Sequence, residues 1–477
     1  MKHFLLLFIA VFTHVYVFGQ AKEAIKHEAD TMQKYLPEKK LSESVMIRHI
    51  TIDGNKVTKR AVILREMSVQ EGDNVAVDSL PLLLNQNKLR LVNMALFNDI
   101  DMQIERVNKN EVDWHIQVKE RWYIIPSLTI QYADRNFNTW YKQGHHELSR
   151  VNTGITVADR NFLGELDTLS ATVQLGYTQG LGLNYQIPYI DKQQKQGLGF
   201  SISYFRSRQT YYATDSDKLQ FVSSNGGYMQ QQIQGGISYI YRPAYKTRHV
   251  FELNYKDYLV QDTLLKLNSD YFRNGSNKAR LLELLYRYQL NEVDNWNYPL
   301  YGFKIVNYAI VRTGFQGFNF QAFDNIEAGT FRNPLPNWYF SAIFRGRLMY
   351  PAKQPYYFQG GLGTSTDYVR GYEYYVIDGS QYGVVRLDLK REVFNKIFKG
   401  IPIEYFTSFP LRIYPKIFAD FGYINGSFSN NSYLNNRLLY SGGIGVDIVT
   451  FYEIKIRIEY AINHLGQNGL YLHFNSE

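Results

Sequence analysis

The stretch that decides the fold is Leu169-Ser170-Ala171-Thr172-Val173-Gln174-Leu175-Gly176-Tyr177-Thr178. Apolar residues occupy every second position, and small or polar residues fill the positions between them. Because successive side chains of a β-strand point to opposite faces, this segment has one apolar and one polar face. The same alternation recurs at 198–204 and 455–460. Repeated segments of this kind predict a transmembrane β-barrel, with lipid outside and a polar lumen inside.

The composition agrees with strands that alternate between lipid and water. Aromatic residues make up 16% of the 477 residues, with 40 Tyr and 30 Phe, yet the mean hydropathy is only −0.33. After the N-terminus no run of 18 apolar residues appears, which excludes a helical membrane protein. Tyr and Phe are the residues that form girdles at the two membrane interfaces. Composition alone leaves a soluble β-sandwich or propeller as the alternative.

The spacing of the alternating segments predicts about sixteen strands within residues 122–477. Eleven precede a long break at 351–381 and five follow it, centred near residues 127, 154, 171, 184, 201, 237, 253, 285, 306, 325, 344, 387, 418, 443, 457 and 471. Sixteen is even, as bacterial single-chain barrels require. If the last strand ends in the periplasm, the break at 351–381 is an external loop.

The first 44 residues are expected to lie outside any folded domain. Residues 1–19 have a basic start and an apolar core from Phe4 to Phe12, which is typical of a cleaved signal peptide, and 20–44 form a polar linker or short helix. The chain has no Cys, so we expect neither disulfides nor a lipid-modified cysteine. The net charge of +8 is scattered, and we therefore expect no nucleic-acid partner.

Residues 45–121 predict a small α/β domain made of a strand, two helices and two further strands. It resembles a POTRA domain through four signatures, Ile52-Asp53-Gly54-Asn55, Glu71-Gly72-Asp73, Ala95-Leu96-Phe97-Asn98-Asp99-Ile100 and Val118-Lys119-Glu120. The resemblance implies a periplasmic domain that binds unfolded clients or partner lipoproteins by adding a strand at a sheet edge. The alternative is a generic α/β spacer.

An arginine inside the predicted barrel marks the candidate site. Val369-Arg370-Gly371-Tyr372 lies in the long break, and a charge there is costly unless it faces the lumen and finds acidic partners. Asp388 and Asp420 both occupy the polar phase of nearby strands. A guanidinium can bind two carboxylates at once, Gly371 permits close backbone approach, and Tyr372 can pack in the lumen. The alternative is an ordinary exposed loop arginine.

A POTRA-like domain before about sixteen strands, with this motif five strands from the end, resembles the BamA/TamA superfamily of outer-membrane proteins with a bacterial surface-antigen barrel. The likeness extends from Val45 to Phe474 and includes Phe418-Ala419-Asp420-Phe421-Gly422 and Asp159-Arg160-Asn161-Phe162-Leu163-Gly164. It implies that the external loop folds back into the lumen and that Arg370 pairs with Asp388 and Asp420. The family's usual residue at the first of these sites is Glu, one methylene longer than Asp388.

The resemblance also implies a lateral seam between the first and last strands. These strands are Tyr123–Tyr132 and Asn468–Phe474, and Gly469 with the short last segment agrees with weak pairing there. In the family mechanism the two strands part and an incoming strand pairs with the open edge.

The function expected from the resemblance is outer-membrane protein assembly or insertion, with the POTRA domain in the periplasm. The expected partners are unfolded outer-membrane proteins or exported clients, periplasmic or lipoprotein partners, and membrane lipid. No Gly-x-Ser-x-Gly motif is present, and His145-His146-Glu147 lacks metal-site spacing, so we expect no catalytic residues, metal or cofactor. Two alternatives remain, a translocase or surface-lipoprotein export barrel, and a passive pore or structural barrel.

Overall fold

The computed structural model describes residues 43–132, 137–142, 147–191, 193–244, 246–399, 408–426, 431–450 and 455–474. The predicted signal peptide at 1–19, residues 20–42 of the predicted linker, and His145-His146 lie outside the described residues. The chain divides into two compact units, one ending at Glu120 and one beginning at Arg121, with Lys56–Arg65 grouped with the second. No helix within the described ranges is both long and apolar enough to cross a membrane.

The N-terminal module is a four-stranded sheet with two α-helices, and the sequence predicts both helices and three of the four strands. The strand order is β2-β1-β4-β3, in which β1 and β4 are parallel and β3 and β4 antiparallel. Its elements are β1 (Ser44–Asp53), α2 (Arg60–Glu66), β2 (Asn74–Ala76), η2 (Val77–Ser79), α3 (Leu80–Asn93), β3 (Phe97–Arg106) and β4 (Glu111–Glu120). Ile47, Leu91 and Trp114 are fully buried and belong to its core. The short strand β2 and the short helix η2 were not predicted from the sequence.

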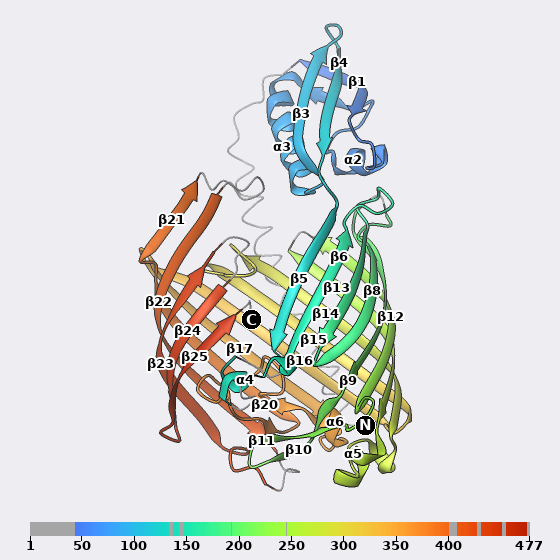
Figure 1. Ribbon diagram of the computed structural model, residues 1–477. Helices are drawn as coiled ribbons and strands as arrows, with labels where there is room; N and C mark the ends of the chain where they lie inside the picture. Colours follow the sequence, from blue (N-terminus) through green and yellow to red (C-terminus); the bar gives the residue numbers. More distant parts are fainter. Residues whose placement is uncertain are drawn as a thin grey trace, which may run out of the picture. The chain divides into compact units, whose positions relative to one another are not determined.

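The rest of the chain forms a closed antiparallel β-barrel (Figure 1). Its strands are β5 (Ile124–Tyr132), β6 (Val151–Asp159), β7 (Thr168–Gly176), β8 (Thr178–Ile187), β9 (Gln196–Ser207), β12 (Gln230–Ala244), β13 (Thr247–Val260), β14 (Lys278–Val293), β15 (Gly302–Gln316), β16 (Phe320–Leu335), β17 (Trp338–Tyr350), β20 (Gln381–Arg391), β21 (Phe394–Lys399), β22 (Ser408–Asn425), β23 (Leu438–Val449), β24 (Lys455–Asn463) and β25 (Asn468–Phe474). Each predicted centre falls inside one of these strands.

Within the described residues the barrel has seventeen strands but sixteen positions around the ring. Both β20 and β21 pair with β22, β20 along 416–425 and β21 along 408–413. They therefore follow one another along the same side of β22 and fill one position. The even number agrees with the sequence prediction and with bacterial single-chain barrels.

The two faces of the barrel wall follow the alternation of the sequence. Apolar residues such as Leu128, Ile202 and Leu253 are about half exposed on the outside, at 65%, 57% and 46%. Charged residues such as Glu283 and Lys416 are buried in the lumen, at 2% and 5%. An apolar outer band with a polar interior is the arrangement that a lipid bilayer requires.

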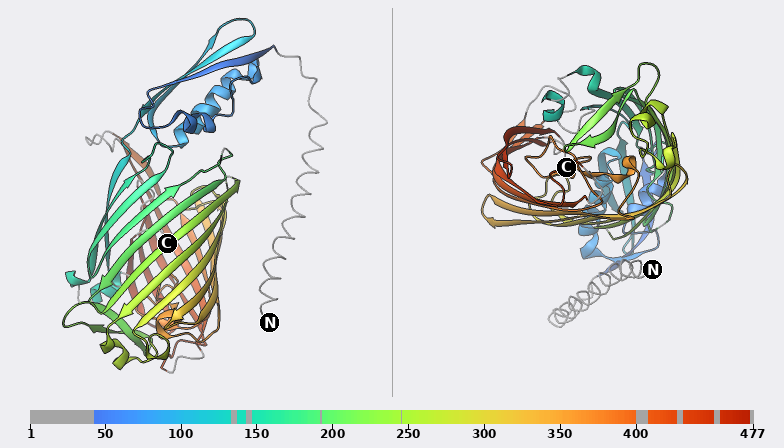
Figure 2. Two further views of the ribbon diagram at one scale, coloured as in Figure 1. Left: turned by 90° about the vertical axis from the view of Figure 1, so that its right-hand side faces the viewer. Right: turned by 90° about the horizontal axis from the view of Figure 1, so that it is seen from below.

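Short elements lie in the connections between the barrel strands. They are α4 (Phe137–Lys142), η3 (Leu148–Arg150), the hairpin of β10 (Gln209–Asp215) and β11 (Lys218–Ser223), α5 (Asp262–Leu267), η4 (Arg273–Gly275), α6 (Tyr356–Gln359), β18 (Gly361–Leu362) and β19 (Ile377–Asp378). Several of them, including α4, α5, β10 and β11, lie near one end of the barrel (Figure 1). Tyr271, Phe272 and Phe358 belong to an aromatic core that joins several of them. In the view from below, the orange segment of residues 351–381 crosses the inside of the ring (Figure 2).

Candidate functional site

The loop 351–381 returns into the barrel and places Arg370 against the lumen wall. Arg370 is 1% exposed, although it lies outside the regular strands. Gly371 has φ +85°, a conformation that side-chain-bearing residues rarely adopt, and its carbonyl accepts a hydrogen bond of 2.9 Å from Asn463 Nδ2. The glycine thus turns the loop directly after the arginine and fixes it to β24.

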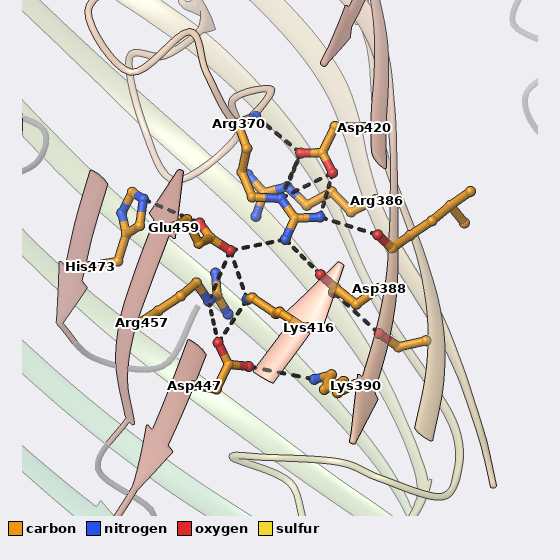
Figure 3. Close-up of polar contacts among 12 residues, drawn as sticks. Arg370, Arg386, Asp388, Lys390, Lys416, Asp420, Asp447, Arg457, Glu459 and His473 are labelled. Carbon is orange, nitrogen blue, oxygen red and sulfur yellow. Dashed lines mark hydrogen bonds and ion pairs between the residues drawn. The ribbon is translucent and has the colours of Figure 1, made fainter. Parts of the chain in front are cut away.

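Both carboxylates expected from the sequence contact the Arg370 guanidinium (Figure 3). Nε donates to the two oxygens of Asp420 at 3.0 and 2.9 Å, and Nη1 donates to Asp388 Oδ1 at 2.7 Å. The Arg370 backbone N–H also donates to Asp420, at 3.0 Å. Asp388 reaches the arginine despite being one methylene shorter than the Glu usual in the family. The geometry matches the planar, multidentate recognition for which arginine is suited.

Sequence reasoning missed a third carboxylate and a second layer of ion pairs beneath it. Arg370 Nη1 also donates to Glu459 at 3.1 Å, and Lys416 Nζ lies 2.7 Å from both Glu459 and Asp447. Lys390 and Arg457 lie within 3.8 and 3.5 Å of Asp447. The alternation places Lys455, Arg457 and Glu459 on the polar face of β24, but it does not show which lumen residues meet at the same level.

The charges in this cluster compensate one another. Burial alone would lower the pKa of Arg370, but Asp388 and Asp420 outweigh it, so the pKa is raised well above its ordinary value. The guanidinium also lies over the ring of Phe418, 4.1 Å from the centroid. Buried ion pairs of this kind contribute little net stability, but removing one partner typically costs about 3–5 kcal/mol because the other charge remains buried. The cluster therefore specifies one position for the loop.

Val369 and Tyr372 hold the same loop through packing and hydrogen bonds. Val369 is 1% exposed, and a Cβ added at Gly422 would lie 2.4 Å from its Cγ2. The Tyr372 hydroxyl donates to the carbonyl of Tyr440 at 3.3 Å and hydrogen-bonds His464. Gly422, the last residue of the motif that begins at Phe418, thus provides the space that Val369 fills.

The predicted seam residues lie on the two strands that the barrel order makes neighbours, β25 and β5. Tyr123 precedes β5 and Tyr132 ends it, while Asn468 begins β25 and Phe474 ends it. The pairing of β25 with β24 runs from Asn468 to Phe474, and β5 pairs with β6 over its whole length. Gly469 lies on β25, where an added Cβ would be 3.0 Å from the Tyr471 ring.

Comparisons with known proteins agree with this architecture. Residues 45–121 match the POTRA family, described as surface antigen variable number repeat. The outer membrane protein assembly factor BamA of Neorickettsia risticii is 23% identical over 265 residues, which cover 54% of this chain and 31% of that protein. The chain thus matches about a third of that relative's length.

Solved structures of two kinds share the fold. BamA from Haemophilus ducreyi lacking POTRA domains 1–3 superposes with a TM-score of 0.61 at 15% identity, over 90% of this chain and 83% of that one. CdiB from Acinetobacter baumannii gives a TM-score of 0.52 at 14% identity, over 91% and 73%. CdiB from Escherichia coli gives 0.52 at 10% identity, over 93% and 80%.

The fold and the Arg370 cluster define a class, the outer-membrane β-barrels that carry a periplasmic POTRA domain. Within that class the chain is similar to BamA, in sequence to the protein of Neorickettsia risticii and in fold to the barrel of the Haemophilus ducreyi protein.

Proposed function

We propose that this protein assembles or inserts other proteins in the outer membrane, and that it does so without catalytic residues, metal or cofactor. The observation that supports this most is the Arg370 cluster, which fixes a loop in the lumen through Asp388, Asp420 and Glu459. Because this loop occupies part of the lumen, we infer that a client passes at the wall of the barrel. The short strand β25 at the seam supports that route.

In this proposal the POTRA domain receives unfolded outer-membrane proteins or a periplasmic partner, including lipoproteins, through a free sheet edge. In the order β2-β1-β4-β3, the strand β3 lies at one edge with ten residues, whereas β2 at the other edge has three. An extended client strand gains backbone hydrogen bonds at an edge of this length. The client then passes to the seam between β5 and β25.

Reconstitution tests the proposal. Vesicles that contain the purified protein should accelerate folding of an urea-unfolded outer-membrane barrel from the same bacterium, measured as protease-protected product. Arg370→Ala should reduce this rate. If vesicles with the protein fold the barrel no faster than empty vesicles, the insertase proposal is wrong.

A translocase, or an export barrel for surface lipoproteins, is the second candidate, and the likeness of fold to the two CdiB barrels supports it. Conductance in planar bilayers separates both candidates from a passive pore. A large, constitutive conductance would favour the pore, whereas the loop and ion pairs in the lumen lead us to expect a small one.

A further inference from the structure

The helix α4, in the connection between β5 and β6, bridges the two strands of the seam (Figure 1). Its aromatic residues Phe137 and Trp140 pack on Tyr132, the last residue of β5, with ring centroids 5.7 and 4.8 Å apart. Its Asn138 binds β25 instead. One short helix therefore contacts both strands that would have to separate.

Asn138 holds two backbone groups of β25. Its Nδ2 donates to the Leu470 carbonyl at 2.5 Å, and its Oδ1 accepts from the Leu472 N–H at 2.9 Å. One planar amide that binds a carbonyl and an N–H two residues apart supplies the donor and acceptor that a residue of a neighbouring strand supplies with its own N–H and C=O, which point to the same side. The Leu472 N–H has a single hydrogen, so another strand can use this position only after Asn138 has left it.

The same helix is tied to the loop that contains Arg370. Thr139 Oγ1 donates to the backbone carbonyl of Glu373 at 3.2 Å. Glu373 lies three positions after Arg370 in the loop. The Glu373 carboxylate in turn lies 3.5 Å from His473 Nε2 on β25. Tyr374 packs on Tyr471 of β25, with ring centroids 5.8 Å apart. The helix, the last strand and the arginine loop thus meet at one junction.

We propose that Asn138 covers the edge of β25 at Leu470–Leu472 and controls access to it, so that an extended strand of another polypeptide pairs there only after it has replaced this side chain. The proposal rests on the proposed function and adds a covering residue to it. The occupant is a polypeptide because the side chain that covers the site presents a donor and an acceptor to the same edge, as the N–H and C=O of a strand residue do. Leu470 is 63% exposed beside this edge, so the incoming strand should alternate apolar and polar residues as β25 does.

The test uses the full-length protein in lipid vesicles. A photo-reactive residue replaces Leu470, and the probe is a synthetic peptide with the sequence of Asn468–Phe474. Amide exchange of β25 is followed in parallel in protein that retains Leu470. Asn138→Ala removes both hydrogen bonds, so we expect exchange and peptide cross-linking to rise by roughly fivefold or more, as for two ordinary bonds.

Two variants control the test. Asn138→Asp keeps the size of the side chain but loses the donor to the Leu470 carbonyl, and it should raise both signals even if Asn138→Ala disturbs α4. Asn152→Ala removes another Asn side chain that accepts from a backbone N–H, that of Thr178 at 2.7 Å, and should leave both signals at the wild-type level.

If amide exchange and peptide cross-linking stay at the wild-type level in both Asn138 variants, the proposal is wrong. Faster exchange without peptide cross-linking would also overturn it, because the edge would then be covered but would not dock a strand. Insertion of a barrel client by the same vesicles is measured separately, so the covering role of Asn138 can fail while the proposed function stands.

Discussion

Arg370 is stabilised by three carboxylates at once, and this sharing has a measurable consequence. Replacing Arg370 with Ala leaves Asp388, Asp420 and Glu459 buried without their common partner, which we expect to destabilise the barrel by about 3–5 kcal/mol. Asp420→Ala should destabilise it by a similar amount. Arg370 and Asp420 belong to one network. The double variant should therefore lose clearly less free energy of unfolding, measured in urea, than the two single variants lose in sum. If the losses of the two single variants simply add up in the double variant, the proposed pairing of Arg370 with Asp420 is wrong.

Gly422 gives a second prediction at the scale of one residue. A Cβ there would lie 2.4 Å from Val369 Cγ2, so Gly422→Ala should displace the loop and destabilise the protein by about 1–3 kcal/mol, the usual cost of overpacking. Gly235→Ala is the matched control, because its Cβ would meet only the Ser201 carbonyl, at 3.8 Å. If Gly422→Ala and Gly235→Ala unfold at the same urea concentration, the packing described for Val369 is contradicted.

At the scale of elements, the short strand β19 predicts a pH dependence of the loop 351–381. Burial and the nearby charge of Asp217 raise the pKa of Asp378 to about 6, against an opposing hydrogen bond from Thr214. The folded loop therefore binds a proton that the unfolded loop releases, and its stability should fall as pH rises from about 4 to 6 and stay constant above. The stability of the loop is measured by its amide exchange, after correction for the pH dependence of the exchange reaction itself.

Asp378→Asn should remove that dependence and keep the loop at its low-pH stability. Asp270→Asn, which changes an exposed carboxyl in another connection, should preserve the dependence. A loop whose corrected exchange does not change between about pH 4 and 6 would exclude Asp378 as the titrating group.

The elements also show how far the sequence could predict the structure. Alternation over seven or more residues located the strands that span the barrel wall, because it records which side faces lipid. It did not predict β18, β19 or α4, since two to six residues are too few to define a period. The same limit explains why Glu459 was missed: alternation gives the face of a residue, whereas its level in the barrel depends on the register between strands.

At the scale of the whole molecule, three features converge on one side of the ring. The loop with Arg370 binds β20, β22 and β24 through Asp388, Asp420 and Glu459, and β24 pairs with β25. The helix α4 bonds to β25 and to the same loop. A change at the seam is therefore connected to the lumen through contacts within the barrel, which is the arrangement that lateral passage of a client would need.

Depletion of the protein in its native bacterium, followed by quantitative proteomics of the outer membrane, tests the central claim most directly. An assembly factor predicts that other β-barrel proteins disappear from the outer membrane, many of them for a general role and one class for a dedicated role. Complementation with the wild-type chain should restore them, and complementation with Arg370→Ala should restore them less. An outer-membrane proteome that stays unchanged after depletion would contradict the account.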